Sequence, residues 1–81
     1  MVKQTTRDRV WITVLQQMFR ETTPAEAVRA PYVAEIANVS ERTARDTLRS
    51  MPFAEQERMG DGRVRYRLDH DWFRAREEAI V

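Results

Sequence analysis

The sequence predicts one small α+β domain in which helices come first and a β-hairpin follows them. Before Pro52, apolar residues recur every three to four positions, which is the period of an α-helix. Over residues 63–68 the period changes to two, as in a half-buried strand, and the only two glycines of the chain lie just before it. Helices followed by a hairpin indicate an α+β fold rather than a parallel sheet.

Length and composition narrow the class of protein. A chain of 81 residues is the length of one domain, so we expect residues 1–81 to form a single unit. The absence of cysteine excludes disulfides, thiolate metal sites and cysteine nucleophiles, and it favours a cytoplasmic protein. No apolar run reaches the roughly 18 residues of a membrane span, and the polar N-terminus does not resemble a signal peptide.

The clearest helical signal covers residues 6–20. Thr5 or Thr6 is expected to cap this helix, with Asp8 in its first turn, where a carboxylate suits the helix dipole. Its apolar residues form a broad stripe along one face, so we expect this helix to form the centre of the core. Its apolar positions are Val10, Trp11, Val14, Leu15, Met18 and Phe19.

The next segment contains a break and a second helix. Thr23 and Glu26 have the spacing of a capping box, with Pro24 in the first turn, so a short helical turn or a loop is expected over 24–29. A second helix is predicted at about 31–37.

A tight corner then leads into a third helix. Asn38 suits the left-handed conformation that such a corner needs, and Ser40 is a strong N-cap. The third helix is predicted over 40–51 and ends before Pro52, because the residue before a proline avoids helical geometry. The residues expected to face inward are Ala44, Leu48 and Met51.

The remaining elements are a hairpin over about 53–68 and a closing helix over about 71–80. The glycines at positions 60 and 62 suit the hairpin turn. The strand that follows places its apolar residues on one face and its arginines on the other. The apolar residues are Val64, Tyr66 and Leu68, and the arginines are Arg63, Arg65 and Arg67, which Arg58 is expected to join from the partner strand.

The spacing within residues 33–51 resembles the helix-turn-helix of winged-helix transcription regulators. Ala34 is the small residue at the helix crossing, and Ala37 and Val39 bracket the turn. The hairpin follows where this family places its wing, and the resemblance covers roughly residues 8–69. The sequence departs from the family pattern at Asn38, Ala44 and Pro52. The matching positions of the recognition helix are Ser40, Thr43, Ala44, Leu48 and Met51.

This resemblance implies sequence-specific binding of double-stranded DNA by a transcriptional regulator, and we expect a repressor rather than an activator. An α-helix fits the major groove, and Arg42 and Arg45 lie near the helix N-terminus, where they would meet base edges. Arg49 would contact the backbone. The expected DNA-binding residues are Ser40, Arg42, Thr43, Arg45, Asp46, Arg49, Arg58, Arg63, Arg65 and Arg67.

A plain solvated surface is the alternative for both arginine groups. Arg42 and Asp46 are four residues apart and could simply pair on the helix. Glu55 and Glu57 could likewise neutralise the hairpin arginines across the strands. Against this, Arg45 and Arg49 are also four apart, and an anionic partner would relieve their repulsion.

Other functions and partners were weighed against DNA binding. The alternative function is a winged-helix module for protein interaction or architecture, which should expose aromatic anchors. We expect no enzyme, cofactor or metal site, because His70 is the only histidine and has no supporting cluster. A homodimer through Trp72, Phe73, Ile80 and the first helix is expected, unless these aromatic rings fold back onto that helix within a monomer.

Overall fold

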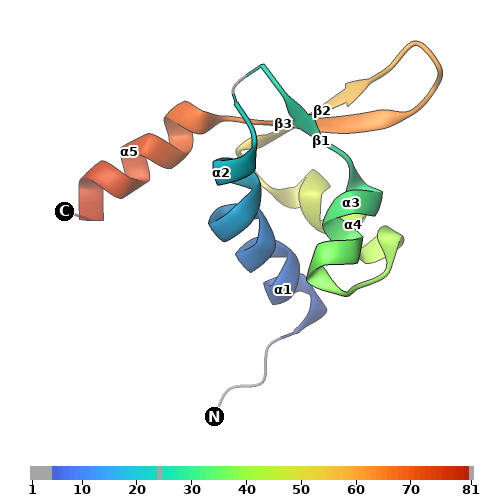
Figure 1. Ribbon diagram of the computed structural model, residues 1–81, viewed down its shortest axis with the longest axis horizontal. Coiled ribbons are helices and arrows are strands. Elements are labelled where there is room, and N and C mark those ends of the chain that lie inside the picture. The colour runs from blue at the N-terminus through green and yellow to red at the C-terminus, as the bar shows by residue number, and fades with distance from the viewer. Residues whose placement is uncertain (1–4, 24, 81) are drawn as a thin grey trace.

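The computed structural model describes residues 5–23 and 25–80, with side chains described as far as Arg76. It is a mixed α+β fold, as the sequence predicts, with a three-stranded antiparallel sheet beside the helices (Figure 1). Within the described residues, no helix combines the length and the apolar character that crossing a membrane requires. The elements in chain order are α1 (Thr6–Thr13), η1 (Val14–Met18), α2 (Phe19–Glu21), β1 (Ala27–Val28), α3 (Ala30–Ala37), α4 (Glu41–Ser50), β2 (Ala54–Arg58), β3 (Val64–Leu68) and α5 (His70–Ile80).

The first helical segment is the predicted one, and α1, η1 and α2 form it without a break. Thr5 caps it as expected: its hydroxyl accepts from the Asp8 amide at 3.1 Å, and the Asp8 carboxylate accepts from the Thr5 amide at 3.1 Å. The sequence did not indicate that the middle of the segment, η1, is a π-helical turn. The fully buried residues of the stripe are Val10, Val14 and Met18, whereas Trp11 and Leu15 are only half-buried.

The turn between α3 and α4 depends on one left-handed residue. Asn38 has φ 57° and ψ 52°, as predicted for the tight corner, and the Val39 amide then donates to the Ala34 carbonyl at 3.0 Å. The Arg9 guanidinium of α1 donates to the Asn38 carbonyl at 3.4 Å. Ser40 caps α4, accepting from the Thr43 amide at 3.1 Å. This turn therefore fixes how α4 is presented beside α1.

The segment 24–29 corrects the sequence prediction, because part of it is a strand and not a helical turn. The predicted capping contact exists, since the Glu26 carboxylate accepts from the Thr23 amide at 3.3 Å. The next two residues nevertheless extend as β1 and pair with β3, with Val28 opposite Tyr66. Pairing satisfies their backbone groups and buries Val28 in the core, so tertiary contacts override the local helix signal.

The hairpin has the predicted turn, but its register corrects the position of Arg58. Gly62 adopts φ 89°, a conformation that favours glycine, and β2 pairs with β3 on either side of the turn. Arg58 lies directly opposite Val64, and directly opposed residues project from the same face of an antiparallel pair. Arg58 therefore shares the face of Val64 and Tyr66 and does not join the arginine face.

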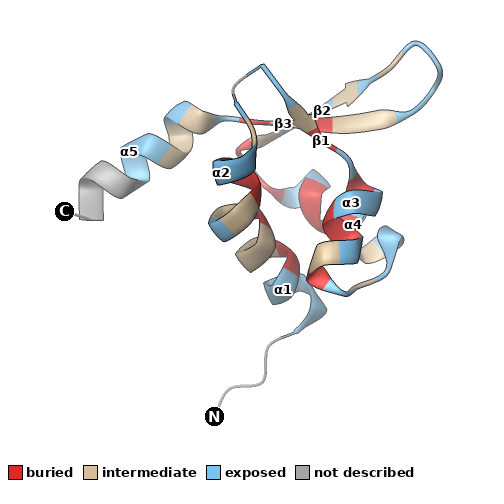
Figure 2. Ribbon diagram, in the orientation of Figure 1, coloured by how far each residue is buried: buried red, intermediate tan, exposed pale blue. Residues whose placement is uncertain are grey.

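The core gathers where the helices face one another and the inner face of the sheet (Figure 2). Phe53 is its aromatic centre, with its ring 5.3 Å from that of Phe19 and 4.4 Å from that of Trp72. Phe73 stacks on Phe19 at 4.5 Å. Trp72 and Phe73 thus pack onto their own chain, which was the monomer alternative, and Ile80 lies outside the described side chains. The homodimer stays a prediction without support from these two rings.

α5 is tied to the body by its first residue. His70 Nε2 lies 2.8 Å from the Thr22 carbonyl oxygen, and Nδ1 lies 3.1 Å from the Leu68 carbonyl oxygen. The histidine therefore has a structural role at the helix entry, joining the ends of α2 and β3.

The left-handed corner makes a testable prediction about stability. We expect Asn38→Ala to lower the free energy of unfolding by roughly 1–2 kcal/mol, because alanine is strained at positive φ. Asn38→Gly should keep or increase it, because glycine carries no such strain. Urea unfolding followed by tryptophan fluorescence measures both variants. Equal stability of the alanine and glycine variants would contradict the role given to this corner.

Candidate functional site

The helix α4 has one buried face and one exposed, charged face. Ala44 and Leu48 are fully buried, as predicted, and Met51 is buried just beyond the helix. Thr47 is also buried, which the sequence pattern did not reveal, and its hydroxyl donates to the Thr43 carbonyl at 2.7 Å. The exposed face carries the predicted residues Arg42, Arg45, Asp46 and Arg49.

The arginines of α4 are held only loosely. Arg42 Nε lies 3.9 Å from Asp46 Oδ2, which is the predicted pairing alternative, and Arg42 is 86% exposed. Arg45 Nη1 lies 4.0 Å from Glu41 Oε1, a pair that the sequence analysis did not consider. Exposed pairs of this spacing contribute about 0.3–0.5 kcal/mol. Among the described residues Arg49 makes no ion pair, so this face can exchange its contacts for an anionic partner at low cost.

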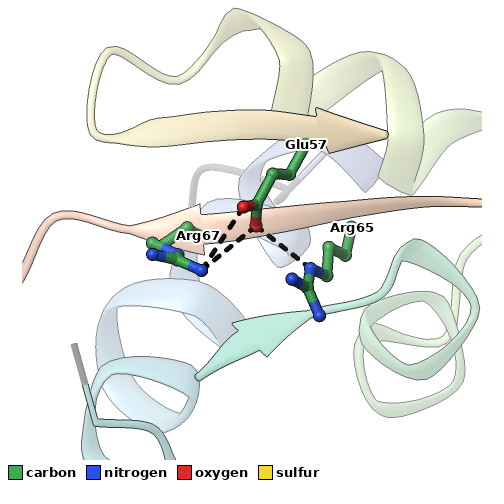
Figure 3. Close-up of polar contacts among 3 residues, drawn as sticks. All are labelled: Glu57, Arg65 and Arg67. Carbon is green, nitrogen blue, oxygen red and sulfur yellow. Dashed lines mark hydrogen bonds and ion pairs between the residues drawn. The ribbon is translucent and has the colours of Figure 1, made fainter. Parts of the chain in front are cut away.

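The arginines on the strand β3 are held more firmly (Figure 3). Arg65 Nε lies 3.0 Å from Glu57 Oε2, and Arg67 Nη2 lies 3.3 Å from both oxygens of the same carboxylate. All three side chains are partly buried, and Glu57 is directly opposite Arg65 in the register. Cross-strand pairing, the alternative to a binding role, is therefore present for Arg65 and Arg67, and the single carboxylate of Glu57 offsets one of their two positive charges. Glu55 is opposite Arg67 but is not its ion-pair partner.

At the hairpin tip, Arg63 is held by the turn itself. Arg63 Nε lies 3.4 Å from Asp61 Oδ2, and its amide donates to Asp61 Oδ1 at 3.0 Å. Both side chains are more than half exposed. Arg63 is thus placed at the tip with its guanidinium open to solvent.

A hollow of about 240 Å³ lies between the beginnings of α3 and α4 and the hairpin tip. Arginines from three separate parts of the chain line it, Arg29 before α3, Arg45 on α4 and Arg63 on the hairpin. The carboxylate of Glu41 also lines it. Three arginines against one carboxylate make the hollow suitable for an anion. We name it the arginine hollow, and Tyr66 lines it as well.

Sequence reasoning missed Arg29 because only the sheet brings it to this site. It follows directly after β1, whose pairing with β3 carries the chain back beside the hairpin. Its one local signal is its place just before the start of α3. Arg7 was also missed, because the packing of α1 against α4 brings it to this helix. From α1 it donates to the Ser50 hydroxyl at the end of α4, at 3.0 Å.

Tyr66 is the one buried polar side chain that lines the arginine hollow. The residue is 1% exposed, and its hydroxyl has no hydrogen-bond partner among the described residues. Burial raises the pKa of this hydroxyl, while the positive charges of Arg49 and Arg45 act to lower it. The hydroxyl is therefore protonated at neutral pH and available as a donor.

Two of the expected DNA-binding residues, Ser40 and Thr43, use their hydroxyls to begin α4. The Ser40 hydroxyl accepts from the Thr43 amide and also donates to the Thr43 hydroxyl at 2.9 Å. Its first role is therefore the N-cap. Ser40 is exposed and Thr43 is half-buried, one on each side of the exposed Arg42 in the chain.

Comparison of the chain with protein-family models, with curated proteins and with solved structures finds no match. The function is therefore argued from the residues and their geometry.

The unpartnered hydroxyl predicts an unusual response to mutation and pH. At pH 7 we expect Tyr66→Phe to keep or raise the free energy of unfolding, because it removes a buried polar group without a partner. The pKa of Tyr66 is raised above its ordinary value of 10.0, because folding favours the protonated hydroxyl over the charged form. The part of the free energy of unfolding that depends on this proton is fully present below pH 10 and is lost as pH rises further. Tyr66→Phe should therefore lose less stability than the parent between pH 9 and pH 11.

Urea unfolding at these three pH values measures the effect. Tyr32→Phe gives the comparison with a surface tyrosine, whose pKa is raised by its hydrogen bond to Glu21 and not chiefly by burial. Tyr32 is an exposed tyrosine whose hydroxyl donates to Glu21 at 3.0 Å. A loss of more than about 1 kcal/mol in Tyr66→Phe at pH 7 would show that the hydroxyl has a stabilising partner.

Proposed function

We propose that this chain is a winged helix-turn-helix protein that binds double-stranded DNA and acts as a transcriptional repressor by occupying its site. The observation that carries the proposal is the arginine hollow, because Arg29, Arg45 and Arg63 come together from three separate elements. Charge gathered in this way beside an exposed helix is what recognition of the DNA backbone requires. The order α3, turn, α4 and hairpin supports the same proposal.

In this proposal α4 is the recognition helix and enters the major groove. The groove is about 12 Å wide and admits an α-helix, and its base edges present a distinct pattern of donors and acceptors. Arg42 near the helix N-terminus contacts bases, whereas Arg45, which lines the arginine hollow, and Arg49 contact phosphates. The ion pairs of Arg42 and Arg45 can open when DNA binds, because each exposed pair contributes well under 1 kcal/mol.

The hairpin β2–β3 is the wing, and its arginines divide into two roles. Arg63 at the tip contacts the DNA backbone. Arg65 and Arg67 stiffen the wing through Glu57 instead of contacting DNA. Arg58, on the other face of the hairpin, has no DNA contact in this proposal.

A protein-interaction role receives less support from the same surface. Interfaces between proteins depend on exposed aromatic and apolar anchors. Among the described residues the exposed large hydrophobic side chain is Tyr32, and it lies on α3, away from the charged face of α4. The α4 face is charged, which favours nucleic acid.

The proposal predicts distinct effects for the α4 arginines. Selection from a pool of random duplexes should enrich a preferred site. On that site Arg42→Ala should cost roughly 1–3 kcal/mol and relax base preference. Arg45→Ala or Arg49→Ala should weaken binding to all duplexes alike and reduce the log–log salt slope by about one unit. Fluorescence anisotropy at several salt concentrations measures both effects.

Two further variants serve as controls for this experiment. Arg74→Ala removes an exposed arginine of α5 and should leave DNA affinity nearly unchanged. Asp46→Asn should raise affinity, because it removes a carboxylate from the DNA-facing side and releases Arg42. Failure of any duplex to bind, or equal losses in Arg74→Ala and Arg45→Ala, would contradict the proposed function.

A further inference from the structure

We propose that the arginine hollow is a phosphate-binding site in which the buried Tyr66 hydroxyl donates a hydrogen bond to a phosphate oxygen. The inference deepens the proposed function by naming a DNA backbone phosphate as the group bound. A free phosphate anion shares the same chemistry, and the experiment below separates the two sources.

The charges around the hollow favour a tetrahedral oxyanion. Arg29, Arg45 and Arg63 supply guanidinium groups that match phosphate oxygens. Arg45 and Arg63 would exchange their exposed contacts to Glu41 and Asp61 for the anion. Main-chain amides contribute little. The first turn of α3 contains Pro31, which has no amide proton, and Ser40 already accepts from the Thr43 amide at the start of α4. Recognition therefore depends on side chains.

Tyr66 is the observation that points to a ligand. It is 1% exposed and lines the hollow, yet its hydroxyl has no partner among the described residues. A buried hydroxyl without a partner is costly, so its presence needs a reason. The strand register explains why it reaches this place, since Tyr66 lies on the inner face of the central strand, beside α4.

Binding requires only a local rearrangement. Arg45 and Arg49 lie close enough to Tyr66 for their charges to act on its hydroxyl. The Arg45 side chain is half exposed and is held by a 4.0 Å contact to Glu41. We expect Arg45 to turn toward the anion, which uncovers the hydroxyl and lets it donate. No charge is gained or lost at Tyr66 in this step.

A DNA phosphate is the source that the position favours. The hollow lies between the beginning of α4 and the hairpin tip, the two elements proposed to meet the groove and the neighbouring backbone. A phosphate held there would fix the distance between recognition helix and wing on the duplex. Phosphate contacts set register and orientation without reading the bases.

The experiment compares Tyr66→Phe with Tyr32→Phe, the exposed tyrosine outside the hollow. Each chain is titrated with duplex DNA by anisotropy, and with inorganic phosphate by ¹⁵N NMR shifts of amides in residues 29–30 and 62–66. We expect Tyr66→Phe to weaken DNA binding roughly two- to tenfold, the effect of one hydrogen bond. Its salt slope should stay unchanged, because no phosphate-neutralising charge is removed. Tyr32→Phe should behave as the parent chain.

Each outcome decides the proposal. Loss of DNA affinity in Tyr66→Phe alone, with or without a loss of phosphate binding, supports the site and assigns it to the backbone. No DNA binding by any chain, but phosphate shifts that Tyr66→Phe abolishes, supports a free-anion site while the proposed function fails. DNA and phosphate binding that Tyr66→Phe leaves unchanged, or that both tyrosine variants weaken equally, overturns the site. The proposed function then still stands on the α4 arginines.

Discussion

The strand β3 lies at the centre of the sheet and positions both the core and the exposed arginines. Its alternation buries Tyr66 and Leu68 on one side and leaves Arg65 and Arg67 on the other, where both pair with the carboxylate of Glu57. Its two edges pair with β1 and with β2. Because both neighbours are fixed by the same strand, the residue that follows β1, Arg29, is carried to the same place as the hairpin tip. A one-residue slip of β3 would reverse its faces and remove the arginine hollow together with half the inner face of the sheet.

The ion pairs on this surface are weak on α4 and stronger on the hairpin, and this difference bears on function. The net charge of the chain is only +1, so attraction to an anion depends on where charges are free and not on their sum. On α4 the pairs are long, exposed and made within one helix, and they can open. On the hairpin Glu57 holds two arginines at 3.0–3.3 Å, which favours a rigid hairpin. In the proposed complex, the first group would change partners on binding while the second would keep the scaffold in shape.

The predictability of the fold follows from how local each signal is. The first helix with its Thr5 cap, the Asn38 corner, the Ser40 cap and the glycine turn depend on residues within a few positions, and the sequence predicted all of them. The strand β1 was missed because its two residues extend only through pairing with β3, which is distant in sequence.

In the candidate site, too, the local features were predictable and those that depend on tertiary contacts were not. The exposed face of α4 follows from helical period, so Arg42, Arg45, Asp46 and Arg49 were found. The face on which Arg58 lies was predicted wrongly, because it depends on the register between β2 and β3. No residue pattern in β2 defines that register. Arg29 and the unpartnered hydroxyl of Tyr66 depend on tertiary contacts, and the one local sign is the place of Arg29 just before α3.

In the proposed complex, α4 and the hairpin tip together form the surface for duplex DNA. The most direct measurement is an amide NMR titration of the ¹⁵N-labelled chain with a short duplex at low salt, where backbone contacts form on any sequence. We expect the largest shifts on residues 29–30, 40–46 and 61–64, and all of them should reverse as salt is raised. Shifts confined to α5, or the absence of shifts at a large excess of duplex, would contradict the proposed complex.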